Sequence, residues 1–432
     1  MRQPSAARRT GAPTAAVVGG GVSGLTAAYL LARDHHVTLF EADTRVGGHA
    51  HTHDVTVRDG GTVPVDSGFI VLNDRTYPLL RRLFAELDVR TRPTEMSMSI
   101  SCDECGLGFV GGRGARGIFA QPHRLLDRRF WRLLLSVRRF QKAALALLAE
   151  DPDGTLTYGE FLERHRFDGY FVYHYALPVV SCVWSMGHQE ALAYPAAYLF
   201  AFLDHHGFLV LRDAPTWHTV VGGSRSYVEA MTARLDAVRP GTPVTAVSRK
   251  PDSVEIDDEL GGHHSFDKVV LATHADEALR LLTDAGQDER EVLGAFGYSS
   301  NVAWLHRDPS VLPPRREERA SWNYRLHGCT TSADRSRVSY WMNRLQGHAE
   351  DDPLVVTLNP RDGEEQRDLV GVVARMTYLH PTYTSATVAA QRRLGALGSD
   401  RLAFAGAYHG WGFHEDGCRS GVAAAAALGA TW

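Results

Sequence analysis

The chain has 432 residues, which is enough for two large domains or about three smaller ones. Its content of 44% hydrophobic and 22% charged residues is that of a globular protein and excludes a collagen-like or largely disordered chain. The formal net charge of -4 gives no indication of a nucleic-acid partner. The 5 cysteines, an odd number, do not form the disulfide framework of a small secreted protein, and no stretch approaches the ~20 apolar residues of a membrane span. We therefore expect a cytoplasmic protein.

The first elements follow a βαβ pattern. Residues 15–18 are apolar and predict a short buried strand, residues 22–32 have helical periodicity, and residues 37–40 predict a second strand. The first strand and the helix are joined by Gly19-Gly20-Gly21-Val22-Ser23-Gly24, which fits G-x-G-x-x-G in the setting that dinucleotide-binding proteins require. A glycine-rich turn without a ligand is the alternative interpretation.

Each residue of this unit has a role in binding a dinucleotide. Gly19 would allow the tight turn, Gly21 the close approach of the pyrophosphate, and Gly24 the packing of the helix on the strand. The N-terminus of the helix, which includes Ser23, offers free N–H groups and a positive dipole end to the phosphates. Glu41 follows the second strand, where a carboxylate can accept both ribose hydroxyls of an adenosine and would repel a 2'-phosphate.

Later segments indicate FAD rather than NAD. Arg45-Val46-Gly47-Gly48 would bring a second glycine turn to the pyrophosphate, with the arginine adding charge. Residues 401–406 predict a strand that ends at Gly406, and residues 412–417 then open an alanine-rich helix. A second helix N-terminus aimed at a long cofactor can stabilise the negative charge that collects on a reduced flavin.

The rest of the chain alternates between two kinds of segment. Helices predominate from residue 77 to 217, including a basic and apolar run at 128–148, and short strands return at 220–273. Strand candidates at 302–305 and 354–358 precede the C-terminal unit. We predict an α/β protein in which a Rossmann-type FAD-binding domain is interleaved with a mixed α+β substrate domain. The FAD-binding domain takes residues 14–76, 218–290 and 396–432, and the substrate domain takes residues 77–217 and 291–395.

Together these motifs resemble the superfamily of flavin-dependent amine oxidases, phytoene desaturases and protoporphyrinogen oxidases. Further matching segments are Val65-Asp66-Ser67-Gly68-Phe69, Val244 near the adenine, and Ala272-Thr273. The resemblance implies a GR2-like Rossmann domain and a set of FAD contacts. These contacts are Gly19, Gly21, Ser23, Gly24, Glu41, Arg45, Gly47, Gly48, Ser67, Gly68, Phe69, Val244, Gly406, Gly412, Phe413 and Asp416.

A narrower resemblance is to bacterial predicted NAD/FAD-binding oxidoreductases that are often encoded beside cyclopropane-fatty-acyl-phospholipid synthases. It rests on short segments spread over the chain. They are Val183-Trp184-Ser185, His206-Gly207-Phe208-Leu209, Trp217, Val221-Gly222-Gly223-Ser224-Arg225, Ser321-Trp322-Asn323-Tyr324, Tyr340-Trp341-Met342-Asn343-Arg344-Leu345-Gln346 and Gly412-Phe413-His414-Glu415-Asp416-Gly417. This branch implies a fatty-acyl or lipid substrate.

Several positions depart from the amine oxidase pattern. Family amine oxidases commonly carry a lysine that holds a water at flavin N5, and the matching position here is Asn301, with no lysine nearby. Ala407 stands where many relatives have an aspartate for the ribityl chain, and Asp416 is the candidate substitute. His49 follows the glycine pair where amine oxidases usually have arginine.

The aromatic residue at the flavin face is retained. Phe413 matches this position, with Tyr408 or Trp411 as its companion. Phe413, Asn301 and the neighbouring His414 are the candidate catalytic residues, as members of the pocket and without an assigned chemical step.

Two further clusters carry ligand chemistry. His49, His51 and His53 would lie on one face of an extended segment and could coordinate a metal, but flavin or surface contacts are the favoured interpretation. Cys102 and Cys105 form a single CxxC without a second pair, which favours a turn with two free thiols over a zinc or redox role. We expect no metal site.

Three functions remain open. The first is an FAD-dependent desaturase or dehydrogenase that takes hydride from an apolar, fatty-acyl or lipid substrate. The second is an amine oxidase that uses oxygen, and the third is a flavin-binding, non-catalytic partner of a lipid methyltransferase. The basic helix at 128–148 could contact an anionic membrane surface, although a cap-domain helix with a solvated arginine face is favoured.

Overall fold

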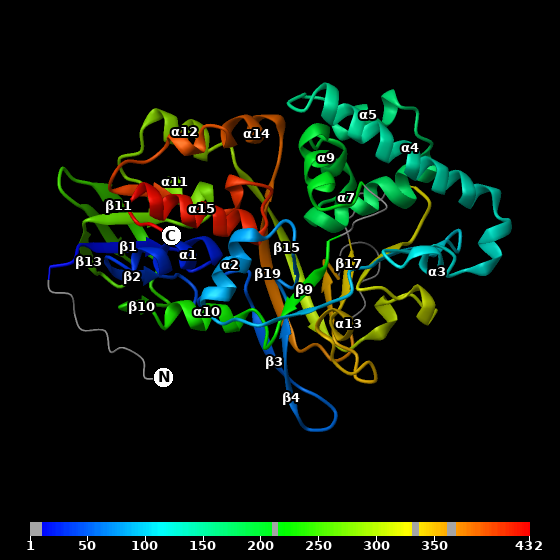
Figure 1. Ribbon diagram of the computed structural model, residues 1–432, viewed down its shortest axis with the longest axis horizontal. Coiled ribbons are helices and arrows are strands. Elements are labelled where there is room, and N and C mark those ends of the chain that lie inside the picture. Colours follow the sequence, from blue (N-terminus) through cyan, green and yellow to red (C-terminus); the bar gives the residue numbers. More distant parts are fainter. Residues whose placement is uncertain (1–10, 210–214, 331–336, 361–368) are drawn as a thin grey trace.

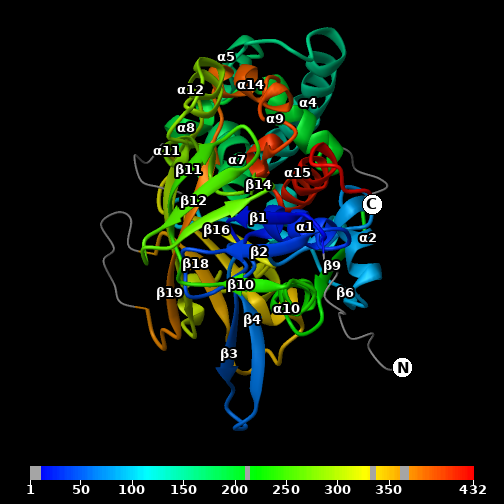
Figure 2. The same ribbon diagram turned by 90° about the vertical axis from the view of Figure 1, so that its left-hand side faces the viewer.

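The computed structural model describes residues 11–209, 215–330, 337–360 and 369–432. Its first layer is a five-stranded parallel sheet with the strand order β10-β2-β1-β14-β20 (Figures 1 and 2). The strands are β1 (Thr14–Val18), β2 (His36–Phe40), β10 (Ala237–Arg239), β14 (Lys268–Leu271) and β20 (Leu402–Phe404). The predicted Rossmann-type fold is confirmed, because β1, the glycine turn and α1 (Val22–Leu31) form the expected unit beside β2.

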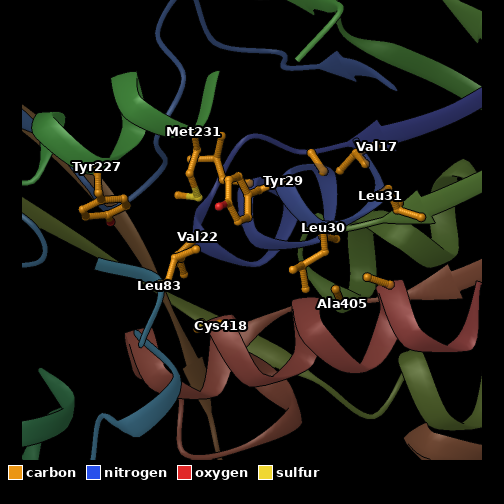
Figure 3. Packing of buried hydrophobic residues seen from close by; sticks show 14 of the residues in the cluster. Val17, Val22, Tyr29, Leu30, Leu31, Leu83, Tyr227, Met231, Ala405 and Cys418 are labelled. Carbon is orange, nitrogen blue, oxygen red and sulfur yellow. The ribbon is translucent and has the colours of Figure 1, made fainter. Parts of the chain in front are cut away.

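Alternate residues of β1 pack on opposite faces of this sheet, as a buried strand requires. Ala15 and Val17 face a core formed with α1, α2 (Pro78–Glu86), α10 (Arg225–Thr232) and α15 (His414–Ala427), which is shown in Figure 3. Ala16 and Val18 face a second core on the other side. That core includes the three-stranded sheet β11 (Val244–Arg249), β12 (Val254–Asp258) and β13 (His263–Phe266), and the helices α11 (Ala275–Leu281), α12 (Gln287–Leu293) and α14 (Ser385–Gln391).

A seven-stranded sheet with the order β19-β15-β18-β17-β16-β7-β8 forms the second part of the molecule. All neighbours are antiparallel except β16 and β7, which are parallel. The strands are β7 (Met98–Cys102), β8 (Gly108–Gly111), β15 (Gly297–His306), β16 (Trp322–Leu326), β17 (Val338–Trp341), β18 (Val355–Leu358) and β19 (Ala374–Thr382), and α13 (Met342–Gln346) follows β17. The expected strands at 302–305 and 354–358 are therefore parts of β15 and β18.

A group of helices covers one end of this sheet and lies at the upper right of Figure 1. It comprises α3 (Gly114–Ile118), α4 (Arg128–Glu150), α5 (Tyr158–Arg164), α6 (Gly169–Phe171), a π-helical turn (Val172–Ala176), α7 (Leu177–Trp184), α8 (His188–Leu192) and α9 (Ala196–His205). Asp127 caps the N-terminus of α4, because its carboxylate accepts hydrogen bonds from the backbone N–H groups of Arg129 (2.8 Å) and Phe130 (3.3 Å). Helix α4 matches the basic, apolar helix expected at 128–148.

Two smaller sheets connect the large layers. The hairpin of β3 (Thr52–Thr56) and β4 (Thr62–Asp66) extends away from the body of the molecule (Figures 1 and 2). Strands β5 (Leu72–Asn73), β9 (Trp217–Val220) and β6 (Thr91–Pro93) form the other sheet. Among the described residues, no helix combines the length and the apolar character needed to cross a bilayer.

The chain passes repeatedly between the two large sheets. The parallel sheet takes strands from residues 14–40, 237–271 and 402–404, and the seven-stranded sheet takes strands from residues 98–111 and 297–382. Both sheets therefore depend on contacts between segments that are distant in the sequence.

Candidate cofactor and substrate site

A large cavity with a volume of about 810 Å³ lies where the parallel sheet meets the seven-stranded sheet and the helical group. It begins at the carboxyl ends of β1 and β2, which is where ligands bind in open α/β sheets. Most residues that the sequence assigned to FAD line it. They are Gly19, Gly21, Ser23, Glu41, Arg45, Gly48, Ser67, Gly68, Phe69, Val244, Gly406, Gly412 and Phe413.

The first glycine turn is shaped by close backbone contacts. Gly19 has φ of 103°, and a Cβ there would lie 2.6 Å from the carbonyl oxygen of Ala272. A Cβ at Gly24 would lie 1.9 Å from the carbonyl oxygen of Gly19, so only glycine lets α1 pack this closely. A Cβ at Gly21 would meet no atom within 4 Å, which leaves open space for a phosphate group at the helix N-terminus.

Glu41 occupies the position expected for a ribose-binding carboxylate. Its Oε2 accepts a hydrogen bond from the backbone N–H of Gly20 at 2.7 Å, and its Oε1 accepts one from that of Asp43 at 2.9 Å. These bonds fix the carboxylate at the wall of the cavity. Each oxygen has a second lone pair, so the group can still accept hydrogen bonds from ribose hydroxyls.

Arg45 holds the second glycine turn in place. Its guanidinium donates to the carbonyl oxygens of Ala50 (2.9 Å) and Gly48 (2.8 Å). A Cβ at Gly48 would lie 3.2 Å from the Cα of Gly21, so the two glycine turns touch. Gly47 does not line the cavity and contributes through the conformation of the turn, with φ of 128°.

The N-terminus of α15 lies beside that of α1. A Cβ at Gly417 would lie 2.6 Å from Val22 Cγ1, and one at Gly421 would lie 2.3 Å from the carbonyl oxygen of Ser23. The two glycines therefore bring the helices into close contact, and both helix N-termini reach the cavity. Two positive dipole ends next to one cavity favour a ligand with negative charge.

Asp66 organises three segments behind the cavity, a role that the sequence analysis missed. Its buried carboxylate accepts hydrogen bonds from Thr52 Oγ1 (2.6 Å), from Ser224 N (2.9 Å) and Oγ (2.7 Å), and from Gln346 Nε2 (2.8 Å). Burial raises the pKa of Asp66 to about 6, although these hydrogen bonds act in the opposite direction. The sequence signal was available, since the three segments were each singled out as motifs, but nothing indicated that they meet.

Besides Gly24 and Gly47, which shape the two glycine turns, two expected pocket residues lie outside the cavity. Asn301 is fully buried in β15, donates from Nδ2 to His380 Nδ1 (3.0 Å), and accepts at Oδ1 from Asn359 (2.9 Å). The prediction that Asn301 lines the pocket is therefore wrong, because its amide supports His380, and His380 forms the wall.

Asp416 is the second correction. Its carboxylate accepts a hydrogen bond from the backbone N–H of Phe413 at 3.0 Å and one from the guanidinium of Arg419. It therefore caps the first turn of α15 and does not line the cavity as a substitute for the missing ribityl aspartate.

Neutral histidines form one wall. His49, His380 and His414 all line the cavity and are partly buried. Burial lowers the pKa of His380 to about 4 and that of His414 to about 3, and burial followed by nearby histidines lowers the pKa of His49 well below its ordinary value. His414 stacks on Phe69 with ring centroids 3.7 Å apart. These side chains are uncharged at neutral pH.

The part of the cavity beneath the helical group is aromatic. Phe413 stacks on Phe202 with centroids 4.7 Å apart, and Trp184 lies 4.6 Å from Phe202 by the same measure. Further members of this wall are His206, Phe208, Trp217, Trp322, Tyr340 and Trp411.

Charge is confined to the other end of the cavity. Among the described residues, the lining side chains of Asp, Glu, Lys or Arg are Glu41, Asp43, Arg45, Glu277 and Arg280. None of the chain's three lysines, Lys142, Lys250 and Lys268, lines it. The cavity thus has a polar end for a nucleotide and an apolar end for a substrate.

Unpaired polar atoms at the wall fit a bound flavin. His49 Nε2 and the Tyr408 hydroxyl are buried and have no hydrogen-bond partner among the described residues, and both residues line the cavity. A buried polar group normally has a partner, so these two atoms are suited to a polar ligand such as the flavin ring system. Together with the open space at Gly21 and the fixed carboxylate of Glu41, they show that the residues present fit FAD.

The fold and the cavity define a protein built to bind FAD. The family model for flavin-containing amine oxidoreductases matches residues 22–368, and the chain belongs to this family. FAD is its cofactor.

Similar proteins act on diverse molecules. A carotenoid phi-ring synthase from Streptomyces griseus is 30% identical over 345 residues, which cover 72% of this chain and 60% of that protein. An (S)-6-hydroxynicotine oxidase from Paenarthrobacter nicotinovorans is 27% identical over 284 residues, covering 64% of this chain and 63% of that protein. The chain thus spans less than two thirds of the length of these curated relatives.

Solved structures share the fold. A fatty acid isomerase from P. acnes has a TM-score of 0.66 at 17% identity, covering 95% of this chain and 97% of that chain. A putrescine oxidase bound to putrescine has a TM-score of 0.64 at 16% identity, covering 96% of this chain and 98% of that chain.

Proposed function

We propose that the protein is a desaturase or dehydrogenase that takes hydride from an apolar, fatty-acyl or lipid substrate. The observation that carries this proposal is the aromatic end of the cavity, where the described wall has neutral histidines and no ionised side chain. An acyl chain is stabilised there by burial of its apolar surface, whereas a protonated amine would lose its hydration without a charged partner. The names of the carotenoid synthase and the fatty acid isomerase accord with an apolar substrate.

The chain's own contribution is to position the substrate and exclude water. Phe202, Trp184 and Phe413 form a packed wall on which an acyl chain can lie. FAD, when bound, supplies the hydride acceptor. The absence of a lysine from the lining is consistent with a reaction other than amine oxidation, since that lysine is the feature expected of family amine oxidases.

Anaerobic reduction of the bound flavin tests the proposal. The FAD-loaded protein is mixed without oxygen with saturated, unsaturated, methylated and cyclopropane acyl lipids, and separately with primary and secondary amines. We expect loss of flavin colour with at least one acyl lipid. Phe413→Leu should slow this reduction while FAD stays bound. The control is Phe167→Leu, which changes a ring of the helical group outside the cavity and should leave the rate of reduction unchanged.

Other outcomes point to the other functions. Reduction by amines with no response to lipids would contradict the lipid proposal in favour of an amine oxidase. A flavin that responds to neither panel, in a protein that forms a stable complex with a lipid methyltransferase, would support a non-catalytic partner.

We also propose that α4 contacts an anionic membrane surface. Its exposed face combines Trp131 (43% exposed) and Leu135 (64%) with basic side chains, and Leu126, just before the helix, is 91% exposed. The basic residues on this face are Arg128, Arg132, Arg138 and Lys142. Apolar side chains among cations suit the headgroup region of an anionic bilayer, from which a lipid substrate would come.

A further inference from the structure

Four potential metal ligands meet at a place remote from the flavin cavity. Cys102 ends β7, Cys105 lies in the turn before β8, Cys329 follows β16, and His174 lies in the π-helical turn before α7. Their three sulfur atoms and one imidazole nitrogen all lie within 4.8 Å of one another. None of the four residues lines the cavity, so the cluster has no part in the site described above.

The distances within the cluster are those of a tetrahedral metal site. Zinc binds thiolate sulfur at about 2.3 Å and imidazole nitrogen at about 2.0–2.1 Å, which places two sulfurs about 3.8 Å apart and a sulfur and a nitrogen about 3.5 Å apart. Cys102 Sγ and Cys329 Sγ are separated by 3.8 Å, and Cys105 Sγ and His174 Nε2 by 3.5 Å. We propose that Cys102, Cys105, His174 and Cys329 bind one zinc ion.

The surroundings orient His174 for this role. Its Nδ1 lies 2.9 Å from the carbonyl oxygen of Tyr170, which can only accept a hydrogen bond. Nδ1 therefore carries the proton, and the lone pair of Nε2 is directed toward Cys105. A carbonyl partner on the second ring nitrogen is the usual arrangement for a histidine that ligates zinc.

The site is closed and structural. Three thiolates and one imidazole complete a tetrahedral shell, so no position is left for water or substrate. The ligands come from the seven-stranded sheet and from the helical group, so the ion would fasten these helices to the sheet. A disulfide between Cys102 and Cys329 would involve only two of the four groups and would not explain why Cys105 and His174 lie beside them.

Metal analysis of the FAD-loaded full chain, purified without chelators, tests the proposal. We expect about one zinc per chain by mass spectrometry of the elements, and on the order of tenfold less in Cys105→Ser and Cys329→Ser. Cys418→Ser is the matched control, because it changes a buried thiol in the core around α1 and α15, away from the cluster. Its zinc content should equal that of the wild-type protein.

Cobalt provides a second measurement that does not depend on the variants folding equally well. Cobalt added to the zinc-depleted protein should give the visible absorption of a tetrahedral thiolate site, and zinc should displace it. A folded, FAD-loaded protein that contains no zinc and gives no such absorption would overturn the proposal. Detection of a Cys102–Cys329 disulfide in protein kept under reducing conditions would do so as well.

Discussion

At the scale of single residues, one buried carboxylate connects segments that the sequence presents separately. Asp66 belongs to β4, Ser224 to the loop before α10, and Gln346 to the end of α13. Ser67 and Gly68, which follow Asp66 directly, line the cavity. The position of this part of the wall therefore depends on hydrogen bonds made one residue earlier in the chain.

Replacing Asp66 should destabilise the protein and weaken FAD binding. Asp66→Ala leaves Ser224 and Gln346 with buried donors that have lost their acceptor, which costs about 2–4 kcal/mol of unfolding free energy. Thermal melting and FAD titration measure the two effects. Asp54→Ala, which removes an exposed partner of Arg225, should change neither quantity appreciably, and equal losses in both variants would contradict this interpretation.

Two glycines of the first turn should respond differently to the same change. Gly24→Ala places a Cβ where it overlaps the backbone of Gly19, so we expect a lower melting temperature and loss of FAD. Gly21→Ala places a Cβ in open space, so the cofactor-free protein should melt as before while its affinity for FAD falls by at least tenfold. Unchanged FAD affinity in Gly21→Ala would show that the pyrophosphate does not approach this turn.

The residue scale also shows where sequence reasoning fails. The roles of Gly19 and Gly24 in the turn follow from a local motif, because the three glycines of that motif fix the geometry of the turn. The position of Asn301 does not, since the side of β15 that borders the cavity depends on how the seven-stranded sheet packs against the rest of the molecule. Asp416 was misplaced for a related reason: an acid in the first turn of a helix can cap that turn as readily as it can face a ligand.

At the scale of elements, α4 has two faces with different functions. Its buried residues, among them Phe130, Leu133 and Phe140, pack on the other helices of the group. The opposite face exposes Trp131 and Leu135 among basic side chains. The alternation along the helix was visible in the sequence, but the sequence could not show that several apolar side chains are left exposed.

Vesicle binding should depend on this face of α4 and on charge. We expect the protein to sediment with vesicles that contain anionic phospholipid but not with neutral ones, and to lose binding as salt increases. Leu126→Glu combined with Trp131→Glu should abolish sedimentation. Leu260→Glu is the control, because Leu260 is 74% exposed in the turn between β12 and β13. Binding that survives the double change would place the membrane contact elsewhere.

At the scale of the whole molecule, buried histidines should make stability depend on pH. Burial lowers the pKa values of six histidines to about 3 or 4 in the folded protein, whereas the pKa of an unfolded histidine is about 6.5. The stability that these neutral histidines contribute is fully present above about pH 6.5 and is lost as the pH falls toward the folded pKa. Asp66 and Glu415, whose pKa values burial raises to about 6 and 7, act in the opposite direction, since their contribution is lost as the pH rises. Six histidines act in the first direction and two carboxyl groups in the second, so the histidines determine the sign of the pH dependence.

We therefore expect the melting temperature to fall by several degrees between pH 7 and pH 5. His306→Gln should reduce this fall, because His306 is buried in β15 and its pKa is about 4. His263→Gln should not reduce it, because His263 is exposed and its contact with Asp257 raises its pKa, so this residue acts in the opposite direction. A melting temperature that stays constant or rises toward pH 5 would contradict the expectation.

The overall architecture was more accessible from the sequence than the site. A local pattern predicts the βαβ unit, the strands at 302–305 and 354–358, and the long helix at 128–148. The structure has a strand or helix at each of these places. The histidines of the cavity wall and the hydrogen bonds around Asp66 have no local sequence pattern, because they form where segments that are distant in the sequence meet. The two sides of the cysteine cluster are separated by 227 residues, and a lone CxxC does not reveal its partners.

The interleaving of the two sheets determines when the protein can complete its fold during synthesis. Strand β20 and helix α15 follow all other strands of the two large sheets in the sequence, yet they supply an edge of the parallel sheet and the cover over α1. Until residues 402–427 have left the ribosome, the apolar face of α1 stays exposed and the nascent chain is prone to aggregation. A nascent chain that still lacks residues 402–427 also lacks Gly406, Gly412 and Phe413 from the wall of the cavity, so we expect it not to hold FAD.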